Sequence, residues 1–162
     1  MHHHVLPTVS ALLLAVALLP AAQAQPAAAP AASAPPPSEF AAKAAKEKDA
    51  LVSETGLVFR TLKEGRGPTP RADDVVRVHY RGTFADGKEF DSSYSRGQPA
   101  EFPLNRVIKC WTEGVQRIAV GGKAKLTCPP HIAYGERGAG GGAIPPNATL
   151  QFEVELIGIV KR

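Results

Sequence analysis

Residues 76–84 read VRVHYRGTF, and the fold class follows most directly from this stretch. Apolar and polar side chains alternate along it, which is typical of a β-strand with one buried face. The residues on its apolar side are Val76, Val78, Tyr80 and Phe84. Asp86-Gly87 follows, a dipeptide that favours a tight hairpin turn, and residues 89–92 can return as a second strand. The stretch therefore predicts an antiparallel sheet with one face turned to the core.

Three further segments extend this sheet. Residues 57–62 have strand composition, and residues 123–128 and 150–157 alternate between apolar and polar side chains. Glycine and proline separate the segments, so short turns and loops connect them.

One segment has a helical period. Ile108, Trp111, Val115 and Ile118 recur at spacings of three and four, which places them on one face of a helix. Asn105 is the expected N-cap, and Gly121-Gly122 the expected end. A sheet with a single amphipathic helix predicts an α+β fold, in which a curved antiparallel β-sheet wraps around one short α-helix.

The N-terminal segment differs from the rest of the chain, since residues 1–37 contain no charged side chain. The apolar run 9–19 is too short for a membrane span, which takes about 20 residues. Ala22-Gln23-Ala24 follows as a cleavage pattern, so we predict a signal peptide over residues 1–24. An uncleaved membrane anchor is the alternative. Cleavage would give a periplasmic or secreted protein without a stable membrane anchor.

Residues 25–38 are rich in proline and alanine and are expected to form a linker. Residues 39–54 are expected to form a short helical extension, with a helix over 39–52 and Ser38 as its N-cap. This helix offers little surface for dimerisation, so we expect a monomer, with a dimerisation helix as the alternative. The globular domain is expected over residues 55–162.

The charge and the cysteine content exclude several classes of function. The net charge of the 162-residue chain is only +4, with no basic block, so we expect no nucleic-acid partner. Cys110 and Cys128 lack the spacing of a zinc site, and we expect no metal and no cofactor. In an exported chain they could form a disulfide, or they could be two small apolar core residues.

Motifs for covalent or phosphate chemistry are missing. The glycine run 138–142 has no P-loop lysine and leads into Pro145-Pro146 instead of a helix. Asp86, Glu89 and Asp91 cluster without a base or metal partner, which disfavours a hydrolase. An apolar cleft with a few polar groups remains as the candidate site.

Five blocks, in order, resemble the signature of the FKBP domain, the macrolide-binding immunophilins. The resemblance covers residues 56–156 and is closest to bacterial exported FKBPs of the macrophage-infectivity-potentiator type. The blocks are Val78–Tyr80, Asp86–Ser93, Val107–Gly114, Ala133–Gly135 and Ile144–Phe152.

The resemblance implies a prolyl pocket with Trp111 as its floor. Tyr134 would donate a hydrogen bond to one substrate carbonyl, and the Ile108 N–H to another. Asp91 would face the amide, oriented by Tyr80 and paired with Arg96. The residues expected to act in catalysis are Asp91, Tyr134, Phe90 and Phe152, and those expected to bind substrate are Tyr80, Val107, Ile108, Trp111, Ile144, Phe102 and Arg96. Taken singly, Trp111, Phe90 and Phe152 would be read as core residues, and Tyr80 and Tyr134 as either core or pocket residues.

Two residues depart from the family pattern. Ala100 stands where the family often has an aromatic wall, and Cys110 replaces a common glycine. The first could widen one side of the pocket, and the second is expected to be neutral.

The resemblance implies a peptidyl-prolyl cis-trans isomerase that acts on proline-containing polypeptides and binds macrolide inhibitors. The alternative is a periplasmic chaperone that binds proline peptides with little catalysis. Only nine residues separate Tyr134 from Ile144, so no inserted chaperone domain is expected there.

Overall fold

The computed structural model describes residues 38–161. The expected signal peptide and the linker up to residue 37 lie outside the described residues. None of the helices in the described part is long and apolar enough to cross a membrane.

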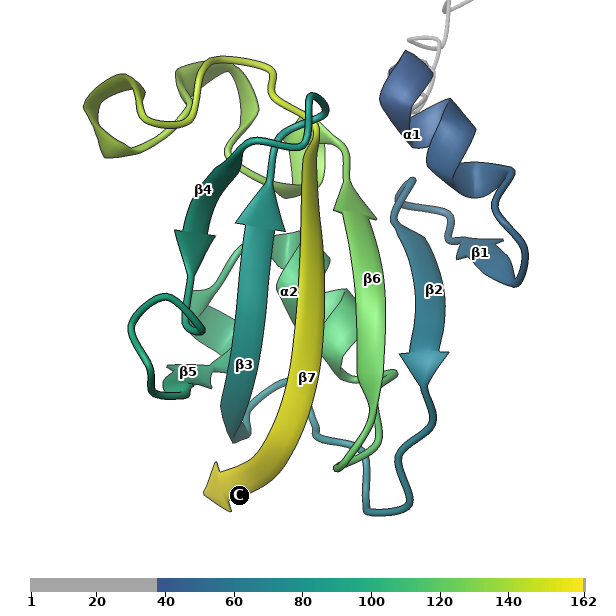
Figure 1. Cartoon of the computed structure of the whole chain (residues 1–162), viewed down its shortest axis with the longest axis vertical. Coiled ribbons are helices and arrows are strands. Elements are labelled where there is room, and N and C mark those ends of the chain that lie inside the picture. The colour runs from purple at the N-terminus through teal and green to yellow at the C-terminus, as the bar shows by residue number, and fades with distance from the viewer. Residues whose placement is uncertain (1–37, 162) are drawn as a thin grey trace, which may run out of the picture. The chain divides into compact units, whose positions relative to one another are not determined.

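Seven antiparallel strands form one sheet, in the order β1-β2-β6-β7-β3-β4, with β5 paired to β3 (Figure 1). The expected α+β fold class is confirmed. The strands are β1 (Ala50–Val52), β2 (Val58–Lys63), β3 (Val75–Thr83), β4 (Glu89–Ser92), β5 (Ala100–Pro103), β6 (Lys123–Cys128) and β7 (Leu150–Lys161).

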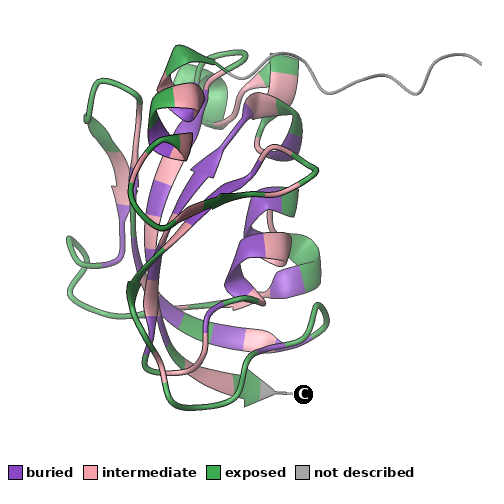
Figure 2. Ribbon diagram, turned by 90° about the vertical axis from the view of Figure 1, so that its right-hand side faces the viewer, coloured by how far each residue is buried: buried purple, intermediate pink, exposed green. Residues whose placement is uncertain are grey.

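The core lies between this sheet and helix α2 (Lys109–Val115), which Figure 1 shows against one face of the strands. The alternating buried residues of β3 and β7 form the sheet side of this core. Figure 2 shows buried bands alternating with less buried ones along the strands. Gly114 lets α2 approach closely, because a Cβ there would lie 2.8 Å from the Leu126 side chain on β6.

Asn105 is not the N-cap of α2, which corrects the sequence prediction. Residues Leu104–Arg106 form a separate 3-10 turn, η1, and α2 begins after Ile108. The Leu104 side chain is fully buried, and its carbonyl accepts a 2.5 Å hydrogen bond from Thr112 Oγ1. These contacts hold Asn105 inside η1.

The N-terminal helix is also shorter than predicted. Helix α1 (Glu39–Ala45) begins at Ser38, whose Oγ accepts a hydrogen bond from the Ala41 N–H as expected of an N-cap. It ends at Ala45 instead of residue 52, because residues 50–52 pair with β2 as strand β1. The gain from strand pairing overrides the helical propensity of this segment.

Helix α1 packs on the domain that follows it. Ala41 and Ala44 are buried, and Ser38 Oγ lies 2.8 Å from Thr149 Oγ1. Glu47 forms ion pairs with Lys125 on β6 and with Arg60 on β2, and the hydrogen bond from Lys125 lowers the pKa of Glu47. The sheet begins with β1 at residue 50, before the first strand that the sequence predicted, at residues 57–62.

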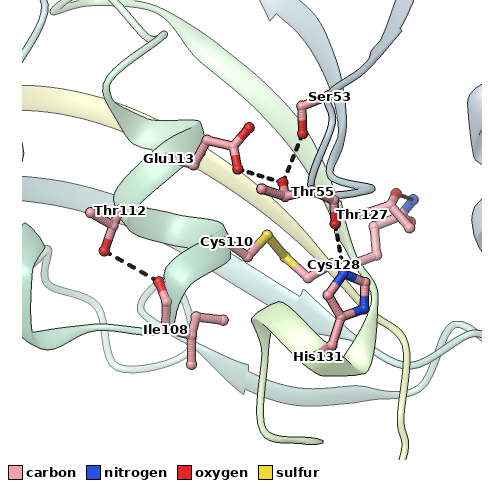
Figure 3. Close-up of a disulfide and its surroundings, with 10 residues drawn as sticks. Ser53, Thr55, Ile108, Cys110, Thr112, Glu113, Thr127, Cys128 and His131 are labelled. Atoms are coloured by element: carbon pink, nitrogen blue, oxygen red, sulfur yellow. Dashed lines mark hydrogen bonds between the residues drawn. A yellow bond between two sulfur atoms is a disulfide. The ribbon is translucent and has the colours of Figure 1, made fainter. Parts of the chain in front are cut away.

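A disulfide joins Cys110 on α2 to Cys128 at the end of β6 (Figure 3). The two Cα atoms are 5.8 Å apart, and both side chains are fully buried. The bond ties the helix to the sheet one residue before Trp111.

Beyond β6, the chain crosses the top of the sheet in three short 3-10 turns. They are η2 (Pro130–Ile132), η3 (Gly135–Arg137) and η4 (Gly140–Gly142). The Asn147 N–H donates a 2.9 Å hydrogen bond to the Gly135 carbonyl and closes this flap at its base.

Candidate active site

An open cavity of about 480 Å3 lies between the sheet and α2. Strands β3, β4, β5 and β7, the turn into α2 and the start of the flap all contribute to it. The lining residues are Tyr80, Phe90, Asp91, Phe102, Arg106, Val107, Ile108, Trp111, Tyr134 and Phe152. The cavity is mainly aromatic, with two charged groups.

Trp111 is the centre of the aromatic cluster. Tyr80, Phe102 and Phe152 surround its indole with ring centroids 5.2, 5.5 and 5.5 Å away. All three rings stand nearly perpendicular to the indole, an edge-to-face geometry that stabilises aromatic pairs. Trp111 comes from α2 and the other three from strands, so helix–sheet packing sets the shape of the floor.

Gly82 on β3 leaves space for a second aromatic wall of the cavity, formed by Phe90 and Phe152. A Cβ at this position would lie 2.6 Å from the Phe90 ring and 3.0 Å from the Phe152 ring. Because residue 82 is glycine, Phe90 and Phe152 can meet edge to face with their centroids 5.6 Å apart.

A polar triad of Tyr80, Asp91 and Arg96 lies beside this cluster. The Tyr80 hydroxyl donates a 2.5 Å hydrogen bond to Asp91 Oδ2. Arg96 donates to Asp91 Oδ1 at 2.6 Å and to the Tyr80 hydroxyl oxygen at 2.8 Å. Each member therefore contacts both others, which orients the Asp91 carboxylate.

These contacts shift the pKa of both acids. Burial raises the pKa of Asp91, but the hydrogen bonds from Tyr80 and Arg96 outweigh it, so that the net pKa lies below the ordinary value. Burial, together with the hydrogen bond to Asp91, raises the pKa of Tyr80. At neutral pH the site therefore holds a carboxylate and a neutral phenol.

The buried Trp111 indole N–H has no acceptor among residues 38–161. Two further uncharged donors at the cavity, the Tyr134 hydroxyl and the Ile108 N–H, also lack an acceptor among these residues. Burial, and then the negative charge of Asp91, raises the pKa of Tyr134, so its hydroxyl keeps its proton at neutral pH. Both groups are free to donate to carbonyl oxygens of a bound peptide.

The structure brings together nine of the eleven residues that the sequence analysis assigned to catalysis or substrate binding. Arg96 contacts two lining residues without lining the cavity itself. Ile144 does not line it either, because its backbone pairs with Ala139 and its side chain is buried in the core. Ala100 packs against the same core.

Sequence reasoning missed Arg106, the second charged residue of the lining. Its position directly before Val107-Ile108 was the available signal. Within the described residues, no group of three or more His, Cys, Asp or Glu side chains could hold a metal ion.

Comparison with known proteins now places this geometry in a family. The sequence model of the FKBP-type peptidyl-prolyl cis-trans isomerases matches residues 67–157, which is more than half of the chain. The chain belongs to the FKBP-type peptidyl-prolyl cis-trans isomerase family. The cavity, the triad and the flap all lie within this FKBP domain.

The FKBP domain is similar to several bacterial relatives. The FKBP-type peptidyl-prolyl cis-trans isomerase FkpA of Escherichia coli K12 is 51% identical over 121 residues, which cover 75% of this chain and 44% of FkpA. The FKBP-type 22 kDa isomerase of the same organism is 52% identical over 116 residues, 72% of this chain and 56% of that protein. This chain spans about half the length of the curated relatives it matches.

Solved structures agree with this assignment. The crystal structure of Escherichia coli FkpA superimposes on this FKBP-type chain with a TM-score of 0.73 at 50% identity, covering 76% of this chain and 57% of that one.

Proposed function

We propose that this chain is a peptidyl-prolyl cis-trans isomerase that accelerates rotation about X–Pro bonds in exported polypeptides. The observation that carries the proposal is the open aromatic cavity over Trp111, with the Asp91 carboxylate and two free donors at its side. The cavity is large enough for a prolyl residue and part of its neighbours, and family membership agrees with this activity.

Desolvation explains how such a cavity could catalyse the reaction. An X–Pro amide resists rotation because its C–N bond has partial double-bond character, and the barrier is about 18–20 kcal/mol. Resonance places negative charge on the carbonyl oxygen, which water stabilises in the planar amide. The twisted transition state has lost much of this charge separation. A water-poor aromatic cavity therefore destabilises the planar amide more than the twisted one.

The lining residues have distinct roles in this proposal. The proline ring packs on Trp111, between Tyr80 and Phe152. The Tyr134 hydroxyl and the Ile108 N–H donate to substrate carbonyls and hold the chain in place. Asp91, held by Tyr80 and Arg96, faces the rotating amide. No acid, base or nucleophile is needed, since no covalent bond breaks.

A protease-coupled assay on a Pro-containing peptide tests the activity. We expect a faster cis-to-trans conversion that is lost when a tight active-site macrolide fills the cavity. A refolding assay with and without the macrolide separates the alternative, because a chaperone with little catalysis would still assist refolding with the cavity blocked. An unchanged conversion rate would reject the proposal.

We also propose an extracytoplasmic location, in the periplasm or outside the cell. The disulfide supports it, because buried disulfides persist in oxidising compartments. The apolar run 9–19 and the cleavage pattern after it support a signal peptide over residues 1–24, followed by the linker 25–38. Mass spectrometry of the mature protein should find Gln25 as the first residue.

The oligomeric state is part of the same proposal. Helix α1 has seven residues and buries Ala41 and Ala44 against its own domain, which leaves it little surface for a partner. We therefore expect a monomer in light scattering.

A further inference from the structure

Arg106 introduces a positive charge into a cavity lined mainly by aromatic residues. Its side chain is exposed and lines the cavity, and it is the last residue of η1, directly before Val107 and Ile108. Among the described residues it has no ion-pair partner. The guanidinium is therefore available to a ligand in the cavity.

The backbone that carries Arg106 is held in place. The Leu104 N–H donates a 3.0 Å hydrogen bond to the Asp74 carbonyl, and the Leu104 carbonyl accepts one from Thr112. The fully buried Leu104 side chain anchors the same turn in the core. A side chain on this fixed turn stays at the mouth of the cavity.

The other charged lining residue, and the acidic residues next to Phe90 and Phe102, are paired with arginines. Asp91 is the only other charged lining residue, and Arg96 pairs with it. Glu101, next to the lining residue Phe102, is paired with Arg77 at 2.7 Å, and Glu89, next to Phe90, with Arg81 at 2.8 Å. Arg106 is therefore the unpaired charged residue of the lining. Lys109, next to Ile108, is exposed and also has no ion-pair partner among residues 38–161, but it does not line the cavity.

We propose that Arg106 determines substrate specificity by favouring prolines flanked by an acidic residue. The inference rests on the proposed function, because it assumes that the proline enters the cavity over Trp111. A Glu or Asp next to the proline then lies at the mouth, where the guanidinium can pair with its carboxylate. A lysine in the same place is repelled. Exposed ion pairs of this kind change binding by roughly two- to fivefold, and salt screens them.

The test compares three tetrapeptides that differ only in the residue before proline, which is Glu, Ala or Lys. The wild-type protein should show a kcat/KM about two- to fivefold higher for Glu than for Ala, and a lower one for Lys. Arg106→Gln should bring the three values together, and Arg106→Glu should reverse their order. The Glu preference should fade as salt rises to about 1 M, where the Debye length is about 3 Å.

Arg66→Gln is the matched control, because Arg66 is exposed and is not among the lining residues of the cavity. This variant should keep the wild-type order of peptides. Three more peptides with Glu, Ala or Lys after proline decide which neighbour Arg106 contacts. The proposal would be overturned if the wild-type protein and Arg106→Glu ranked the peptides identically by kcat/KM, both in the series that varies before proline and in the series that varies after it.

Binding is measured in parallel so that failure of the isomerase proposal can be distinguished from failure of this one. Trp111 is the only tryptophan of the chain, so its fluorescence reports occupancy of the cavity without turnover. If no peptide is isomerised but Kd follows the Glu, Ala, Lys order and reverses in Arg106→Glu, only the isomerase activity is rejected. If Kd is the same for all peptides, or none binds, the specificity role of Arg106 is rejected.

Discussion

Asp91 is held between two donors, and its proposed role depends on both. The Tyr80 hydroxyl and the Arg96 guanidinium each bind one of its carboxylate oxygens. If this carboxylate faces the rotating amide, removing it should slow the reaction while leaving the fold intact, because the side chain is 42% exposed and fills no space in the core.

We expect Asp91→Ala to lower kcat/KM about tenfold, which corresponds to about 1.4 kcal/mol of transition-state stabilisation. The measurement is a protease-coupled assay alongside thermal unfolding. Glu153→Ala is the matched control, because Glu153 is 41% exposed and pairs with Lys123 at 3.2 Å without lining the cavity. Both variants should melt at similar temperatures. Full activity in Asp91→Ala would remove Asp91 from the proposed site.

The pH dependence follows from the same contacts. The pKa of Asp91 is lower in the folded protein than in the unfolded chain, where it is about 3.9. Its stabilising contribution is therefore complete above about pH 3.9 and is lost as pH falls through the lower folded pKa. The raised pKa of Tyr80 has the opposite sign, so its contribution is lost only as pH rises through a folded value above about 10.

We therefore expect neither group to change kcat/KM between about pH 5 and pH 9. Exchange NMR on an X–Pro peptide measures this without a protease that titrates itself. An inflexion inside this range that disappears in Asp91→Ala would show that the Asp91 carboxylate is not held ionised.

At the scale of elements, α2 determines where the floor of the cavity lies. The helix carries Trp111, and the disulfide at the preceding residue, Cys110, ties it to β6. Figure 3 shows this bond between Cys110 and Cys128. The bond closes a loop with a sequence separation of 18 residues. A loop of this length stabilises a fold by about 3 kcal/mol, mainly by restricting the unfolded chain.

Replacing both cysteines, Cys110→Ala with Cys128→Ala, should lower the free energy of unfolding by about 3 kcal/mol. Urea unfolding, followed by far-UV circular dichroism, measures this loss. A reductant should destabilise the wild-type protein to a similar extent and leave the double variant unchanged. Thiol titration of the denatured, unreduced protein should find no free thiol, and a result of about two thiols would contradict the disulfide.

Periodicity predicted elements well where neighbours in sequence determine them. The alternation of β3 and β7 predicted both strands, and the helical spacing of Ile108, Trp111, Val115 and Ile118 predicted a helix here. The predicted end at Gly121-Gly122 is wrong, because α2 ends at Val115. The incorrect predictions lie where contacts between residues distant in the sequence determine the local structure. Residues 50–52 leave the predicted helix because β2 offers them a partner, and Asn105 loses its cap role because Thr112 and Asp74 hold the turn around Leu104.

At the scale of the whole molecule, the sheet and α2 share one core, and the cavity lies between them. The cavity could be predicted from the FKBP-like blocks, because these blocks contain most of the aromatic residues that line it. The place of Arg106 in the lining could have been inferred from its neighbours Val107 and Ile108, but its lack of an ion-pair partner is visible only in the structure. Ile144 shows the opposite case. It lies within a signature block, but its side chain packs in the core and does not line the cavity.

The central claim is that this cavity turns prolyl peptide bonds, and exchange NMR on one X–Pro peptide tests it most directly. Uncatalysed exchange takes tens to hundreds of seconds at 25 °C. With a catalytic amount of the protein, exchange peaks between the cis and trans forms should appear within about a second and vanish when a macrolide fills the cavity. An exchange rate equal to that of the peptide alone would contradict the account.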